Sequence, residues 1–171
     1  SAGNDRSSYF FSLGYFDQQG TLIETFLKRY SARINTLFNV GKRLRIGENA
    51  YVLYRSAPGL PNGNQDEGNP ISHSYRESPI IPVYDIRGNY AGTFSQGLGN
   101  AQNPVANLRR THHNKGNNWQ VLGNVFAELD LFNHVTARTS FGGTIDNNYW
   151  YTFNFTAYEN AENRTNANSF Q

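Results

Sequence analysis

Hydrophobic and polar residues alternate along several stretches of the chain, and the clearest alternation runs from 118 to 145. Odd-numbered positions between Trp119 and Leu129 are apolar or small, whereas the even-numbered positions between them are mostly polar. A period of two is typical of a β-strand whose two faces differ. The alternation pauses after Asp130 and resumes at Val135, so the pattern predicts a β-hairpin.

The same period predicts three strands ahead of this hairpin. The first has Tyr9, Phe11 and Leu13 on one face, with Phe10, Ser12 and Gly14 on the other. Short turns are expected at 40–43 and 130–134, and the long polar connection contains two extended pieces joined by a turn around Arg87-Gly88-Asn89. The expected strands are 7–16, 26–40, 44–55, 118–130 and 135–151, and the long loops are 56–116 and 157–171.

Charged residues test which face of each strand could meet lipid. In the second strand, Arg29, Arg33 and Asn35 share one face, and the aromatic and aliphatic residues from Tyr30 to Phe38 share the other. An arginine on the lipid face of a barrel costs roughly 2–4 kcal/mol near the middle of the bilayer. We therefore expect the two arginines to point into a water-filled lumen and the opposite face to contact lipid.

The third strand, 44–55, allows two facings. If Glu48 points inward, Arg45 and Arg55 are left on the outer face and must lie near the membrane interfaces, where a charge costs about 0–1 kcal/mol. The outer face then also carries Gly47, Asn49, Tyr51 and Leu53. The opposite facing would expose Glu48 to lipid, so the first facing is expected.

Composition favours β structure over an ordinary globular core. Hydrophobic residues make up only 37% of the 171 residues, whereas aromatic residues reach 15%. A disordered chain would lack these aromatics. The net charge is +2, and no block of lysine or arginine stands out, so nothing indicates a nucleic-acid partner. No apolar run approaches the roughly 18 residues of a membrane-spanning helix, so a membrane could be crossed only by strands.

The connections are short on one side of the expected sheet and long on the other. This asymmetry is the signature of an outer-membrane β-barrel, with short periplasmic turns and long extracellular loops. The expected fold is therefore all-β, an antiparallel transmembrane β-barrel segment of about five strands.

Five groups of short motifs follow one another in a fixed order along the chain. They are Ser8–Gly20, Lys28–Asn35, Arg45–Asn49, Pro82–Asp85 with Gly88–Gly92, and Gly123–Asp130 with Arg138–Gly142. Each motif alone is common, but the ordered series, which covers most of the chain, resembles the middle barrel region of SusC/RagA-type TonB-dependent outer-membrane transporters of Bacteroidetes.

The resemblance implies a much longer protein, with a plug domain inside a barrel of roughly 22 strands. Five strands cannot close a barrel, so residues 1–171 are expected to be a partial barrel domain of a larger plugged barrel. As the resemblance implies, the whole protein would sit in the bacterial outer membrane. There it would import oligosaccharides or peptides with a SusD-like lipoprotein lid and TonB, without catalysis or a cofactor.

Two groups of side chains are candidates for contacts. Plug or wall contacts are favoured over direct substrate contact for the lumen group, and plain loop packing is favoured for the loop group. The lumen-facing candidates are Arg29, Arg33, Asn35, Glu48, Asn124, Glu128 and Arg138, and the extracellular-loop candidates are Tyr75, Tyr84, Asp85, Tyr90 and Phe94.

Two other classes of protein are alternatives. A soluble β-sandwich carbohydrate-binding module would bury the aromatic faces inside one compact domain. A glycosidase fragment would need a facing pair of carboxylates, and Asp66, Glu67 and Asp85 have no spacing that singles them out. His112 and His113 are adjacent, and neighbours on a strand point to opposite faces, so the pair is a poor chelate and is expected to be plain loop histidines.

Overall fold

The computed structural model describes residues 2–4, 6–59, 69–160 and 168–170. The chain divides into two compact units. The first unit comprises Ser1–Asp17, Lys28–Ser56 and Asn117–Tyr149, and the second comprises Gln18–Leu27, Ala57–Gly116 and Trp150–Gln171.

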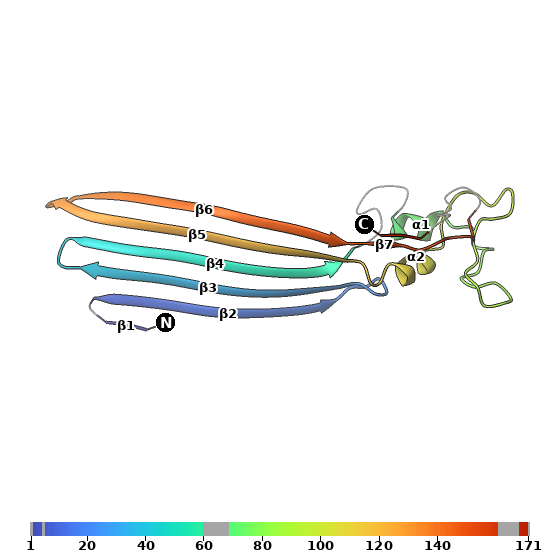
Figure 1. Ribbon diagram of the computed structural model, residues 1–171, viewed down its shortest axis with the longest axis horizontal. Helices are drawn as coiled ribbons and strands as arrows, with labels where there is room; N and C mark the ends of the chain where they lie inside the picture. The colour runs from blue at the N-terminus through green and yellow to red at the C-terminus, as the bar shows by residue number, and fades with distance from the viewer. Residues whose placement is uncertain (1, 5, 60–68, 161–167, 171) are drawn as a thin grey trace. The chain divides into compact units, whose positions relative to one another are not determined.

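The first unit contributes to a six-stranded sheet in which neighbours in sequence are neighbours in space (Figure 1). The predicted antiparallel sheet is confirmed, and the short β1 is a strand that the alternation does not predict. Polar residues such as Asp17 do not end a strand here, because backbone pairing does not depend on the polarity of a side chain. The strands are β1 (Ala2–Asn4), β2 (Ser7–Gln19), β3 (Phe26–Val40), β4 (Leu44–Pro58), β5 (Lys115–Phe132) and β6 (Val135–Tyr151).

Tight turns join β3 to β4 and β5 to β6 at the same end of the sheet, which we call the turn end. Gly41 has a φ of +72° in the first turn, and His134 has the same value in the second. The backbone N–H of Asp130 donates to the carbonyl of Arg43, so the two hairpins are bonded to each other there. The opposite end, where β2, β4 and β6 finish, is called the loop end.

The two faces of the sheet are defined by register and by side-chain contacts. Residues directly opposite in a ladder share a face, and Arg33 lies opposite Tyr51, Asn35 opposite Asn49, and Thr36 opposite Glu48. Contacts of Arg45 with Glu128, and of Glu128 with Arg138, extend the Arg33 side across β5 and β6. We call this side the polar face; it carries the odd-numbered residues of β3 and β4 and the even-numbered residues of β2, β5 and β6.

The register corrects the predicted facing of the third strand. Glu48 lies on the side opposite to Arg29, Arg33 and Asn35, and its side chain is exposed there. The facing predicted for Gly47, Asn49, Tyr51 and Leu53 is therefore also wrong, and Arg45 and Arg55 belong to the polar face. The prediction compared the cost of Glu48 in lipid with the cost of Arg45 and Arg55 near the interfaces, and it placed Glu48 inward. The facing is set instead by the backbone pairing of β4 with β3.

The other side, called the aromatic face, carries a continuous row of rings near the loop end. Ring centroids lie 5.0 Å apart for Tyr15 and Tyr30, 6.1 Å for Tyr30 and Tyr54, and 4.6 Å for Tyr54 and Trp119. The row thus crosses four neighbouring strands. Beyond it, Leu13 is 70% exposed and Phe141 is 85% exposed, so this face is not covered by other described residues.

The second unit contains two short helices, α1 (Pro70–Arg76) and α2 (Pro104–Arg110), which pack against each other. Each begins with an asparagine cap followed by proline, a start signal present in the sequence but not used in the prediction. Neither helix has the length or the apolarity needed to cross a bilayer, and no other helix in the described residues has them. The small sheet of this unit pairs β7 (Phe153–Asn154) with β8 (Ser169–Phe170).

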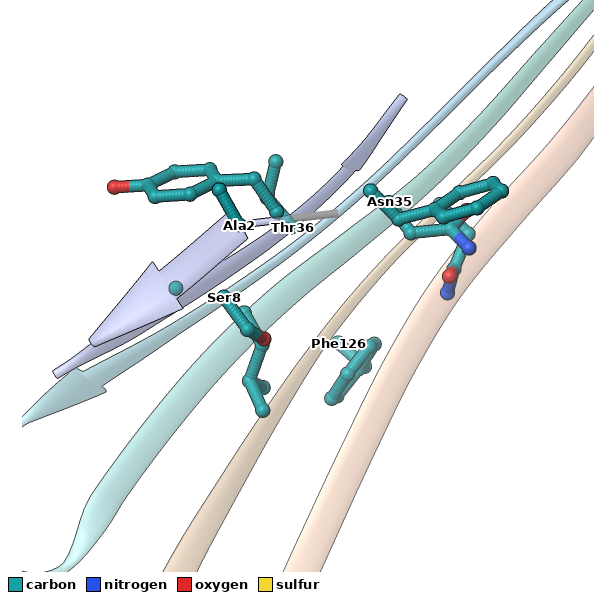
Figure 2. A pocket seen from close by; sticks show the side chains of 10 residues that line it. Ala2, Ser8, Asn35, Thr36 and Phe126 are labelled. Atoms are coloured by element: carbon teal, nitrogen blue, oxygen red, sulfur yellow. The ribbon is translucent and has the colours of Figure 1, made fainter. Parts of the chain in front are cut away.

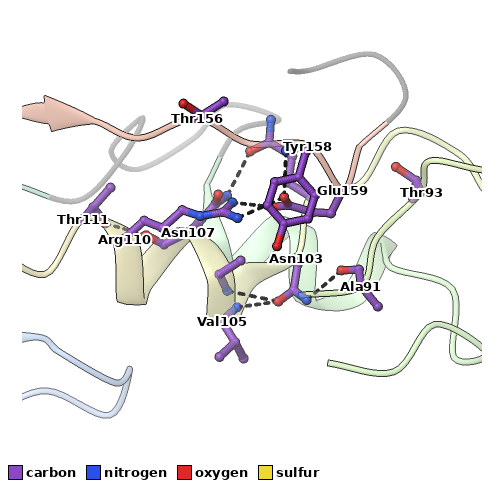
Figure 3. Close-up of polar contacts among 12 residues, drawn as sticks. Ala91, Thr93, Asn103, Val105, Asn107, Arg110, Thr111, Thr156, Tyr158 and Glu159 are labelled. Carbon is purple, nitrogen blue, oxygen red and sulfur yellow. Dashed lines mark hydrogen bonds and ion pairs between the residues drawn. The ribbon is translucent and has the colours of Figure 1, made fainter. Parts of the chain in front are cut away.

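Polar contacts hold the second unit together (Figure 3). The buried Asn103 side chain accepts from the N–H groups of Val105 and Ala106, and it donates to the carbonyls of Val83 and Ala91. Phe153 N–H donates to the Asn114 side chain, which joins the segments before and after the β5–β6 hairpin. The expectation that the long 56–116 connection is folded is confirmed for its described part.

Candidate functional site

A hollow of about 790 Å³ lies in the first unit, mainly on the polar face. Three of the predicted lumen residues, Arg33, Asn35 and Asn124, meet there, although they come from strands distant in sequence. The residues that line it are Arg33, Asn35, Asn49, Ala50, Tyr51, Leu122, Gly123, Asn124, Gly142, Gly143 and Thr144.

The lining of this hollow suits a ligand that is rich in hydrogen-bonding groups. Asn35, Asn49 and Asn124 offer amides that both donate and accept, and Tyr51 adds a flat ring. Gly142 keeps the floor open, because a Cβ at this position would lie 2.9 Å from the carbonyl oxygen of Gly123. These groups are of the kind that bind a polar solute.

A second hollow, of about 580 Å³, adjoins β1 (Figure 2). It shares Asn35 and Asn49 with the first. The ring of Phe126 lies over Gly47, where an added Cβ would come within 2.3 Å of it. The residues that line this hollow are Ala2, Gly3, Ser8, Tyr9, Phe10, Asn35, Thr36, Leu37, Asn49 and Phe126.

Two of the predicted lumen residues, Glu128 and Arg138, belong to an ion-pair cluster at the turn end. Arg45 bonds to Glu128 at 3.0 Å and to both carboxylate oxygens of Asp130 at 2.9 Å. Arg138 bonds to Glu128 at 3.1 Å and lies 4.4 Å from the ring centre of Phe126. Glu128 and Arg138 thus pair with each other and with Arg45, which links β4, β5 and β6.

The remaining lumen candidates lie elsewhere on the sheet. Arg29 is on the polar face near the loop end, 5.2 Å from the ring centre of Phe16. Glu48 is on the aromatic face and stands apart from the other six. Asn49, Tyr51 and Arg45 are not among the predicted lumen residues, because the predicted facing of β4 is the reverse of the observed one. Comparing the charges on odd and even positions of β4 would have found them. Arg45 and Arg55 are both at odd positions and Glu48 is at an even one, so the odd positions carry more charge.

The loop candidates lie in the second unit and do not form one site. Tyr84 and Tyr90 stack at 5.4 Å across a bridge that closes the predicted turn around Arg87-Gly88-Asn89. Tyr75 is 75% exposed and Phe94 is 61% exposed. Asp85 is held within the turn by three hydrogen bonds, from the N–H groups of Arg87 and Asn89 and from the Asn89 side chain.

These bonds give the Asp85 turn an expected pH dependence. The backbone N–H of Asn89, then its side chain and the Arg87 N–H, hold the pKa of the Asp85 carboxyl below its ordinary value. A lowered pKa in the folded state means that the stabilisation is present above the unfolded pKa of about 3.9 and is lost as pH falls through the folded pKa. We expect the Asn89 amide resonance of the whole protein to shift only under strongly acidic conditions.

The control for this titration is Asp85→Asn, which keeps an acceptor oxygen but cannot titrate. Its Asn89 resonance should stay constant over the same pH range. A carboxyl resonance of Asp85 that titrates at or above the value of an unstructured aspartate would contradict the prediction.

The adjacent histidines lie in a connection between regular elements, as expected for loop histidines. His112 and His113 lie in the turn after α2 and not on a strand, and their ring centroids are 3.6 Å apart. The strand argument against a shared ligand is therefore wrong. Among the described residues, no group of three His, Asp or Glu side chains is placed to hold a metal ion. Asp66 and Glu67, considered for a glycosidase, lie outside the described residues.

Comparison with known proteins points to one class of protein. No family model matches the chain. It is 26% identical over 152 residues to TonB-dependent receptor P3 of Formosa agariphila, in an alignment that covers 86% of this chain and 15% of that receptor. It is 27% identical over 146 residues to TonB-dependent receptor P26 of the same species, with 84% and 14% covered. The chain thus spans about one seventh of the length of these curated relatives, and its similarity to them supports the TonB-dependent receptor family.

Proposed function

We propose that this chain is part of the barrel wall of a TonB-dependent importer in a bacterial outer membrane, of the SusC/RagA type. The observation that carries the proposal is the separation of the sheet into a polar face and an aromatic face over five neighbouring strands. In a barrel the aromatic face contacts lipid and the polar face lines the lumen. The row from Tyr15 to Trp119 then lies at the membrane interface, where amphipathic rings are enriched.

In this proposal residues 1–171 are a partial barrel domain. The turn end faces the periplasm, and the loop connections face the exterior. Further strands pair with β1 and β6, so that no sheet edge is left unpaired in lipid. The whole protein then carries a plug, takes energy from TonB, and imports oligosaccharides or peptides under a SusD-like lipoprotein lid, which contacts exposed loop residues such as Tyr75 and Phe94. It carries out no covalent chemistry.

A soluble β-sandwich would explain the alternation less well. Its interior face would be covered by a second sheet. On the aromatic face, however, Leu13, Phe141 and Ile145 are 70%, 85% and 71% exposed. The exposed apolar face therefore favours the lipid-facing proposal over the sandwich.

Fractionation of the source bacterium tests the proposed function. We expect the natural protein in the outer-membrane fraction, soluble only with detergent, with an intact mass several times that of this chain. Uptake of its solute should stop when a protonophore collapses the proton gradient that powers TonB, while binding to the cell surface persists. A water-soluble species with the mass of this chain alone would contradict the proposal.

A further inference from the structure

Near the loop end of the polar face, two arginines stand directly opposite each other. Arg29 of β3 and Arg55 of β4 are partners in the ladder, and both side chains are exposed. Directly opposed residues in an antiparallel pair have Cβ atoms only about 4.5–5.5 Å apart, and like charges at that position are destabilising. An opposed arginine pair therefore calls for a counter-charge.

No acidic side chain among the described residues of the polar face provides this counter-charge. Glu128 and Asp130 pair with Arg45 and Arg138 at the turn end. Asp146 accepts hydrogen bonds from the side chains of Asn118, Gln120 and Asn148. The contact of Arg29 with the Phe16 ring orients its guanidinium but leaves its charge uncompensated.

Arg33 extends the positive charge along β3 into the larger hollow. It lies four residues from Arg29 on the same face, about 13 Å along a strand. Within the hollow its Nε donates to Asn35 at 3.4 Å, and none of the described residues that line the cavity is acidic. The Arg33 guanidinium thus shares the hollow with side-chain amides and the ring of Tyr51, which are groups that bind a polar solute.

We propose that Arg29 and Arg55 bind an oxyanion, a carboxylate or sulfate group, of the imported solute, and that Arg33 binds the next part of the same molecule. This inference rests on the proposed function, because it places the polar face in the lumen, and it narrows the solute to an anionic one. Two guanidinium groups offer planar sets of N–H donors that match carboxylate and sulfate oxygens. The hollow that Arg33 lines, further along the same face, has the volume of a small-molecule site.

The test is calorimetric titration of the purified full-length protein in detergent with sodium sulfate and with sodium acetate, at ionic strength held constant with chloride. We expect saturable binding of at least one anion, and the preferred anion distinguishes a sulfate group from a carboxylate. In the Arg29→Gln/Arg55→Gln variant the affinity for the anion should fall at least about tenfold, because the loss of even one hydrogen bond between charged groups weakens binding by about that factor.

Lys28→Gln is the matched control. Lys28 precedes Arg29 in β3, but it lies on the aromatic face and pairs with Asp17 at 3.7 Å, so its removal should leave the anion affinity unchanged. The thermal unfolding midpoint of each variant in detergent reports whether it is folded.

Two results would overturn the inference. Wild-type protein that binds neither anion would mean that a carboxylate elsewhere in the full-length chain already neutralises the arginines. Equal binding by wild type and the double variant would mean an adventitious ion only. Both results are independent of the proposed function, which fails instead if the protein is found outside the outer membrane.

Discussion

Replacing Arg110 by alanine is expected to open the second unit locally, with a loss of about 3–5 kcal/mol of stability in that unit. Arg110 forms two charged hydrogen bonds to Glu159, whose side chain is only 1% exposed (Figure 3). The guanidinium also lies 5.2 Å from the ring centre of Tyr90 and 5.7 Å from that of Tyr158. Removal of the arginine would leave a buried carboxylate without its partner, which is the costly case for a buried ion pair.

Hydrogen exchange of the full-length protein measures this effect. We expect faster amide exchange in α2 and in 153–160, with the first unit unchanged. The control is Arg109→Ala, because Arg109 pairs with Glu24 at a site where its side chain is 53% exposed, and such pairs contribute about 0–1 kcal/mol. Equal exchange in the two variants would show that the Arg110 pair does not hold the unit together.

Placing an arginine on the aromatic face is expected to destabilise the membrane-inserted protein by roughly 2–4 kcal/mol, the cost of this residue in lipid near the bilayer middle. Ile34 suits the test because it lies opposite Ala50, within β3 and away from both ends. Its neighbour Asn35 points to the polar face. Asn35→Arg should therefore change stability by only about 0.5 kcal/mol, as substitutions at wetted positions usually do.

The two variants differ by one position along the same strand and introduce the same residue, so chain length and net charge are matched. Their denaturant unfolding should be compared in lipid vesicles, where the Ile34→Arg midpoint is expected to fall and the Asn35→Arg midpoint to stay near wild type. A larger loss for Asn35→Arg than for Ile34→Arg would reverse the assignment of lumen and lipid faces.

Alternation predicted the facing of most strands because each carries a clear contrast between its two sides. In β5, Trp119 and Glu128 fall on opposite sides as expected, and Arg138 of β6 joins Glu128. Only β4 was placed wrongly, since it carries charges on both parities. Its facing follows from pairing with β3 through the turn at Gly41, which a single strand considered alone does not contain.

The candidate site could be predicted only in part for a related reason. Arg33, Asn35 and Asn124 were expected on one polar wall, and the structure brings them into one hollow. Asn49 and Tyr51 complete that hollow only because β4 lies between β3 and β5, and β4 and β5 are neighbours across the long connection 59–114. The opposed arginines likewise depend on which residue of β4 stands opposite Arg29.

What the sequence alone determined is local: the strands and the contrast between their faces, which depend on residues two positions apart, and the short turns, where that alternation pauses. The tertiary structure decided everything that depends on pairing between strands. It placed Glu48 on the aromatic face, engaged Glu128 with Arg45 and Arg138, and opposed Arg29 to Arg55. The physical reason is that a shift of one residue in register moves every side chain of a strand to the other face, and long-range backbone pairing sets that register.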